Sequence, residues 1–170
     1  MRDVDILVER EMRGEKVDCR RGCDWCCHQL VIITNWDDGV AILRAARERM
    51  DEAEFAAFEN RVREQARQIG SLSHEEAEAK RWTCPLLKDG ECSVYDVRPV
   101  ACRSVFSSDQ RCCQAMMEAE RFEDLSEPHQ ALAEEIGERA MRIQIEANDQ
   151  RTVHGAIELR ALLVRLLERS

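Results

Sequence analysis

The sequence predicts a mostly α-helical fold in a single domain, with the helices packed around an irregular, cysteine-rich core. The chain of 170 residues contains only 7 Gly and 3 Pro, so few turns are expected and helices are favoured. Apolar residues recur at three- and four-residue steps over long stretches, which is the spacing of one helix face. The 9 cysteines fall into two dense blocks, and the domain must fold so that the blocks meet.

The segment before the second cysteine block has the pattern of a helical insertion over residues 36–82. Residues 1–17 are expected to form a short polar helix or arm, and residues 30–34 a short strand or an extended lead-in to a helix. A helix is predicted from Trp36, with one apolar face made by Val40, Leu43, Ala46 and Met50. The cysteine-rich core, residues 19–115, is thus interrupted by this insertion.

Two capping-box spacings predict the starts of the next two helices: Asp51 with Glu54, and Ser73 with Glu76. The first of these helices is expected to end with Gly70 as its C-cap. The second is expected to end near Trp82. The apolar face of the longer one is formed by Phe55, Phe58, Val62, Ala66 and Ile69.

Helices are also predicted to fill the C-terminal part, residues 114–170. The first is expected over Gln114–Glu123, and Ser126 with Pro128 marks the start of a long one. The apolar stripe of the long helix is Leu132, Ile136, Ala140, Ile143 and Ala147. Residues 157–167 are apolar over more than one face, so this end is either well buried or part of a homodimer contact.

Charge and hydropathy exclude several functional classes. The net charge is −9, which argues against a general nucleic-acid binder and against attachment to an anionic membrane surface. No stretch approaches the roughly 20 apolar residues of a membrane span, and charges interrupt every short apolar run near the N-terminus. We therefore expect a cytoplasmic protein. In that reducing compartment, we interpret the cysteines as metal ligands or redox groups rather than as disulfides.

The cysteine spacing predicts metal binding. The first block has the spacing C-x3-C-x2-C-C and contains Cys19, Cys23, Cys26 and Cys27. The second block contains Cys84, Cys92, Cys102, Cys112 and Cys113. Thiolates from such loops can converge on a tetrahedral ion at about 2.3 Å each. An isolated cysteine is more often a small buried hydrophobic residue than a ligand. One of the adjacent pair Cys112 and Cys113 could have only a packing or redox role. Of the two, Cys112 is the expected eighth ligand.

The number of thiols leaves the type of metal centre open. Eight thiolates would complete two four-thiolate zinc sites or one binuclear centre with bridging sulfurs, whereas four would hold one [4Fe–4S] cluster. His28 follows the first block and is either a further ligand or a solvated side chain. Arg98 and Arg103 either offset the negative charge of the thiolates or are ordinary surface residues.

The two blocks together resemble the YkgJ-like cysteine-cluster proteins, bacterial proteins named for zinc or iron chelation. The resemblance rests on CRRGCDWCC and on CPLLKDGECSVYDVRPVACRSVF, and it extends over residues 19–115. The first spacing is x3 where many members have x2. A more distant likeness is to FliB, a flagellin lysine-N-methylase that resembles iron–sulfur enzymes. The resemblance implies a metal, zinc or iron, and Tyr95, Arg98 and Pro99 match its motif as expected structural support for the ligands.

Three functions are consistent with this sequence. The first is a structural or interaction module in which two zinc ions, or iron, organise the fold and a helical surface binds a protein partner. The second is an iron–sulfur enzyme acting on a protein or small-molecule substrate, suggested by the thiols beyond four. The third is a metal chaperone or sensor, suggested by the adjacent cysteines. The sequence contains no phosphate-binding glycine loop or nucleophile elbow to identify catalytic residues.

Overall fold

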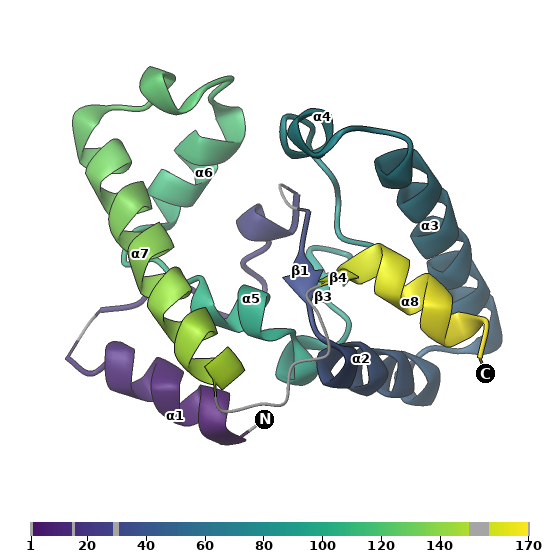
Figure 1. The fold of residues 1–170 in the computed structure, drawn as a ribbon. Helices are drawn as coiled ribbons and strands as arrows, with labels where there is room; N and C mark the ends of the chain where they lie inside the picture. Colours follow the sequence, from purple (N-terminus) through teal and green to yellow (C-terminus); the bar gives the residue numbers. More distant parts are fainter. Residues whose placement is uncertain (1, 15, 29–30, 150–156, 170) are drawn as a thin grey trace.

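The computed structural model describes residues 2–14, 16–28, 31–149 and 157–169, and it confirms a single, mostly helical domain with small sheets (Figure 1). The elements of the first half are α1 (Arg2–Glu11), the 3-10 turn η1 (Trp25–His28), β1 (Ile33–Thr34), α2 (Trp36–Arg49), α3 (Glu52–Gly70) and α4 (His74–Glu78). None of the helices in these ranges combines the length and apolar character that crossing a bilayer demands.

The second half begins with a hairpin, and its last strand returns to pair with the first half. Its elements are β2 (Leu87–Lys88), β3 (Glu91–Cys92), the 3-10 turn η2 (Tyr95–Val97), α5 (Val100–Ser104), α6 (Gln110–Glu118), the 3-10 turn η3 (Phe122–Asp124), α7 (Glu127–Asp149), β4 (Ile157–Glu158) and α8 (Leu159–Leu167). β4 pairs antiparallel with β1, with Ile33 opposite Glu158.

Two groups of helices flank the cysteine loops. In Figure 1, α2, α3 and α8 lie on one side, while α1, α6 and α7 lie on the other, with α5, η1 and the short strands between them. The larger core is formed by the first group, and its fully buried members include Ile42, Phe58, Val62, Leu162 and Leu163. A smaller core joins α1, α5 and α7. Burial of these stripes supplies the main driving force that holds the cysteine loops together.

The apolar stretch near the C-terminus packs inside the chain. Leu159, Leu162 and Leu163 of α8 are at most 1% exposed, and they pack against α2 and α3. Of the two expectations for this stretch, the buried one is therefore confirmed. Packing within the chain accounts for its apolar character, and a homodimer remains an untested prediction.

The capping boxes at the starts of α3 and α4 are confirmed, because in each the cap side chain and the third helical residue bond reciprocally. Two boundaries differ from expectation. Ser71 rather than Gly70 is the C-cap of α3. The backbone N–H of Ser71 donates to carbonyls of the last helical turn, and Ser71 is not in a left-handed conformation. α4 ends at Glu78, well before Trp82, whose indole N–H donates to the Ala77 carbonyl.

The expected face of α2 is wrong at Val40, which is 43% exposed. The core side of α2 is formed instead by Gly39, Ile42, Leu43 and Ala46. The reason is the approach of α8: the side chains of Leu162 and Leu166 lie over Gly39, so the helix turns this glycine inward and Val40 outward. In α7, Ile136, Ala140, Ile143 and Ala147 are buried as predicted, while Leu132 is only half-buried.

Candidate metal centre

A tight loop ending in a 3-10 turn positions the first cysteine block. Gly22 has φ +87°, a left-handed conformation that side-chain-bearing residues rarely adopt. The Cys23 N–H donates to the Arg20 carbonyl at 3.0 Å and the Cys27 N–H to the Asp24 carbonyl at 2.8 Å. The sequence suggested an entirely irregular loop, but these local bonds wind the adjacent pair Cys26–Cys27 into η1.

The second block is built on a two-residue hairpin. Asp89 and Gly90, with φ +50° and +77°, connect β2 to β3, which is the conformation that an Asp-Gly type I′ turn requires. The hairpin places Cys92 opposite Leu87. Cys102 lies further on, within the short helix α5.

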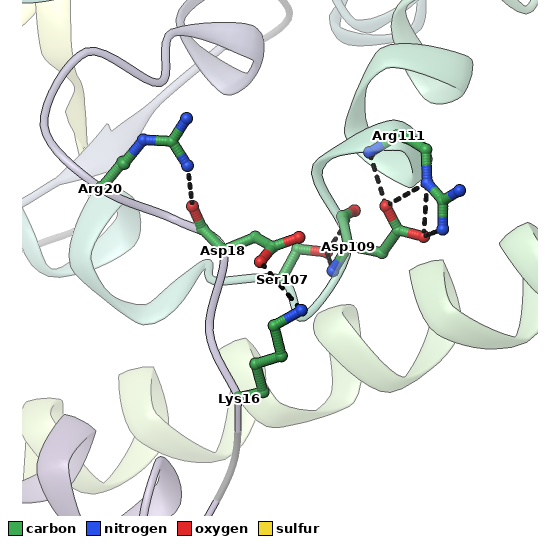
Figure 2. Close-up of polar contacts among 6 residues, drawn as sticks. All are labelled: Lys16, Asp18, Arg20, Ser107, Asp109 and Arg111. Carbon is green, nitrogen blue, oxygen red and sulfur yellow. Dashed lines mark hydrogen bonds and ion pairs between the residues drawn. The ribbon is translucent and has the colours of Figure 1, made fainter.

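Two backbone contacts join the blocks. The Cys84 N–H donates to the Cys27 carbonyl at 2.7 Å, so the two blocks are hydrogen-bonded directly at cysteine positions. The Asp18 N–H donates to the Ser107 carbonyl at 2.9 Å, which ties the start of the first block to the loop before α6. Figure 2 shows this second junction, where Lys16 and Arg20 lie around Asp18, beside Ser107 and Asp109.

Six cysteines from both blocks line one cavity of about 40 Å³: Cys23, Cys26, Cys27, Cys84, Cys92 and Cys102. Their apolar neighbours include Leu86, Val94 and Leu159, each at most 2% exposed. Leu159 belongs to α8, far from either block in sequence, and no spacing in the sequence indicated that it would form a wall of this cavity. The cavity is thus a pocket of thiols inside the larger hydrophobic core.

Burial is the main electrostatic influence on these thiols. It raises the pKa of Cys84 to about 11, and it raises the pKa values of Cys92 and Cys102 as well. The adjacent pair behaves differently. A hydrogen bond between the two side chains lowers the pKa of Cys26 to about 7 and raises that of Cys27.

Arg98 is a cation that lines the same cavity as the thiols. Its guanidinium carbon lies 3.7 Å from the centroid of the Tyr95 ring, and its Nε donates to the Tyr95 carbonyl at 3.0 Å. Both residues line the cavity. The charge of Arg98 contributes to the lowered pKa of Cys26 and partly opposes the rise that burial causes in the pKa of Cys92. Arg103, the other expected neighbour, forms an ion pair with Asp5 of α1 instead.

The remaining three cysteines lie outside the cavity lining. The Cys19 thiol accepts a hydrogen bond from the Ser107 N–H at 3.2 Å. Cys112 is fully buried and its thiol donates to the His129 carbonyl at 3.4 Å, whereas Cys113 is half-buried. The predicted helix at Gln114 in fact begins at Gln110, so both adjacent cysteines lie within α6.

His28 is turned toward a carboxylate. Its Nε2 lies 3.0 Å from Asp24 Oδ2, and it is not among the cavity-lining residues. The expectation that His28 adds a ligand therefore has no support in this arrangement.

The chemistry of the cavity fits a soft metal. Thiolates are the ligands preferred by zinc and by iron–sulfur clusters. Across the described ranges, no three Cys, His, Asp or Glu side chains are already arranged around one point as an ion would require. Rotation about χ1 moves a cysteine Sγ between staggered positions, so binding would draw the cavity thiols inward from where they stand.

Comparison with known proteins places this arrangement in a family. A family model named CxxCxxCC and described as "Putative zinc- or iron-chelating domain" matches residues 18–116, a range that includes all nine cysteines. Searches of the curated proteins and of the solved structures returned no match. The family match confirms the resemblance to the YkgJ-like proteins and supports a metal as the cofactor. The chain therefore belongs to the CxxCxxCC family, whose domain carries this description.

Proposed function

We propose that this protein binds zinc or iron through thiols of both cysteine blocks, and that the metal centre organises the fold so that the helical surface can bind a protein partner. The observation that carries this proposal is the gathering of six cysteines around one cavity. The ligands proposed there are Cys23, Cys26, Cys27, Cys84, Cys92 and Cys102. The nine cysteines are free thiols, which suits the reducing cytoplasm as the location.

The position of the cavity favours a structural role over catalysis. A structural zinc site is closed by its protein ligands, whereas a catalytic site keeps a position open for water or substrate. Cys84 is buried, and its neighbours Leu86, Val94 and Leu159 belong to the hydrophobic core. The other five lining cysteines are half-buried, and this apolar wall on one side favours a centre whose coordination is completed by thiolates.

Counting ligands favours two zinc ions over one. Two tetrahedral ions have about eight coordination positions. Six thiolates fill them if two of the six bridge both ions. The net charge of such a centre is about −2, because six thiolates oppose two divalent ions. Arg98 lies beside it to offset part of that charge.

An iron–sulfur enzyme is the second candidate, and one feature favours it. Four of the cavity thiols would hold a [4Fe–4S] cluster, and two would remain for chemistry on a protein or small-molecule substrate. A metal chaperone or sensor is the third candidate, because the hydrogen bond with Cys27 lowers the pKa of the Cys26 thiol to about 7, which favours its thiolate form.

Metal analysis of protein purified without oxygen separates these candidates. About two zinc per chain in a colourless protein supports the zinc centre. About four iron with the broad visible absorption of a cluster overturns the zinc reading and supports the iron–sulfur alternative. Protein that contains no stoichiometric metal, and that takes up neither zinc nor iron when reduced, refutes the proposal.

Thermal unfolding then separates the structural role from the chaperone. Metal binding contributes to the folding free energy when the site exists only in the folded chain. A strong chelator should therefore lower the melting temperature as metal leaves. If metal is removed and the melting temperature does not change, the centre has no structural role, and the result favours a metal chaperone.

A further inference from the structure

We infer that a pocket between α3 and the β2–β3 hairpin binds a small organic acid with an apolar body and a single carboxylate, and that Arg61 holds this carboxylate. The pocket has a volume of about 370 Å³, which is within the range of small-molecule sites. None of the described residues that line it is a cysteine, so the inference does not depend on the proposed metal centre.

Three segments of the chain form the walls of this pocket. One face of α3 contributes Glu54, Ala57 and Arg61, which are spaced by three and four residues. The end of α2 contributes Arg49 and Met50, and the hairpin region contributes residues 86–89 and Ser93. The shape of the pocket is therefore set by how the hairpin lies along α3.

Polar contacts hold the hairpin along α3 at both ends of the pocket. Nε and Nη2 of Arg61 donate to the Pro85 carbonyl at 3.4 and 3.2 Å. Lys88 forms an ion pair with Glu54, which precedes Arg61 by seven residues, or about 10 Å along the helix axis. The segment from Pro85 to Lys88 thus runs antiparallel to α3, with Arg61 at one end of the pocket and Glu54 at the other.

Apolar groups line the space between these ends. Leu86 is 2% exposed and belongs to the larger core. Met50 and Leu87 are half-buried and pack against the same core. Ala57 is exposed and has only a methyl side chain, so α3 leaves this part of the pocket open. The removal of an apolar ligand body from water against these groups favours binding.

Arg61 is the lining cation that has no carboxylate partner among the described residues. The guanidinium of Arg49 pairs with Asp96 at 2.6 Å, and Lys88 pairs with Glu54. Arg61 bonds a backbone carbonyl through two of its five N–H donors. The remaining donors can bind a carboxylate, which is the anion that the planar guanidinium fits best together with phosphate.

The acidic groups at the other end of the pocket limit the ligand to one carboxylate. Glu54 lies at that end, and Asp89 follows Lys88 at the tip of the hairpin. A second carboxylate placed there would be repelled by both side chains. The ligand is therefore a monocarboxylate whose apolar end is directed toward the hairpin tip.

Probes of equal chain length and different charge test this site. The full chain, with the metal it carries when purified, is titrated with hexanoate, hexan-1-ol, hexylammonium and adipate, and binding is followed by ligand-observed NMR. We expect hexanoate to bind with a Kd of about 1 mM or tighter, and each of the other three to bind at least about tenfold more weakly. Absence of hexanoate binding overturns the site, equal binding of hexan-1-ol or hexylammonium overturns the role of the carboxylate, and equal binding of adipate overturns the limit to one.

Two matched pairs of variants then locate the binding. Arg61→Gln should weaken hexanoate binding by roughly 10–100-fold, whereas Arg67→Gln, on the same helix but paired with Glu64, should leave it unchanged. Ala57→Leu places a larger side chain in the pocket and should abolish binding, whereas Ala56→Leu, at the adjacent exposed position, should not.

The two pairs are independent, so a failure of one variant to fold, seen by far-ultraviolet circular dichroism, leaves the other pair decisive. Hexanoate binding that survives in a folded Ala57→Leu overturns the inference. The same conclusion follows if Arg61→Gln and Arg67→Gln bind hexanoate equally well.

Discussion

Replacement of Gly39 by alanine tests the packing of α8 on α2. A Cβ at Gly39 would lie 2.5 Å from Leu162 Cδ2, 2.9 Å from Leu162 Cγ and 3.1 Å from Leu166 Cδ1. Leu162 is fully buried, so its side chain has little room to move away. We therefore expect Gly39→Ala to push α8 from α2 and to destabilise the chain.

Gly137 provides the matched control, because it lies inside α7 and a Cβ there would meet nothing within 4 Å. Both substitutions gain about 1 kcal/mol of helix propensity. Only Gly39→Ala meets the overpacking penalty, which is about 1–3 kcal/mol. The two variants should therefore differ by about 2 kcal/mol in free energy of unfolding. That difference corresponds to roughly 4–8 °C in melting temperature for a chain of this size.

Thermal and urea unfolding of both variants, each with its metal content measured, would show the difference. We expect Gly137→Ala to melt slightly above wild type and Gly39→Ala well below Gly137→Ala. Equal melting temperatures for the two variants would refute the close approach of α8 to α2. A lower urea midpoint with an unchanged slope would indicate a change in stability alone.

Three further substitutions probe what positions the cavity. Asp38→Ala removes the carboxylate that accepts a hydrogen bond from the first backbone N–H of α5 at 3.0 Å. It should lower the free energy of unfolding, measured in urea, by about 1.5–3 kcal/mol. The control Asp37→Ala, at an exposed position, should lower it by less than about 1 kcal/mol. Arg98→Gln should leave the fold intact and weaken metal retention against a competing chelator by roughly 10–100-fold, and unchanged retention would contradict its role beside the thiols. Glu158→Gln removes the negative charge that pairs with the fully buried Arg160 at 2.8 Å. We expect the free energy of unfolding, measured by thermal unfolding, to fall by about 3 kcal/mol. A fall of less than about 1 kcal/mol would show that other partners stabilise Arg160.

Local signals in the sequence predicted local structure well. The capping boxes at Asp51 and Ser73 satisfy backbone donors through side chains only three residues away, so the sequence contains the whole interaction. The inward face of α2 was different. Whether Gly39 or Val40 faces the core depends on where α8 lies, and that contact spans more than a hundred residues.

The candidate site shows the same division. The spacing of the cysteines identified every thiol that lines the cavity, because dense cysteine blocks are themselves the signal. Distinguishing Cys112 from Cys113 needed the start of α6, because the position of this helix buries Cys112 fully and leaves Cys113 half-buried. The cysteine spacing could not predict the contributions of Ser107 and Leu159. Ser107 contacts Cys19 through its backbone N–H, and Leu159 belongs to α8, far from both cysteine blocks in sequence.

The position of Leu159 has a consequence for the order of events during synthesis. The Leu159 N–H bonds to the Ile32 carbonyl at 2.8 Å, and its side chain forms a wall of the cavity. A ribosome releases α8 after both cysteine blocks, so the thiols are available before the apolar wall that encloses them. If the proposed metal reaches the thiols during translation, it meets loops that α8 has not yet covered, and loading would be easiest before α8 docks.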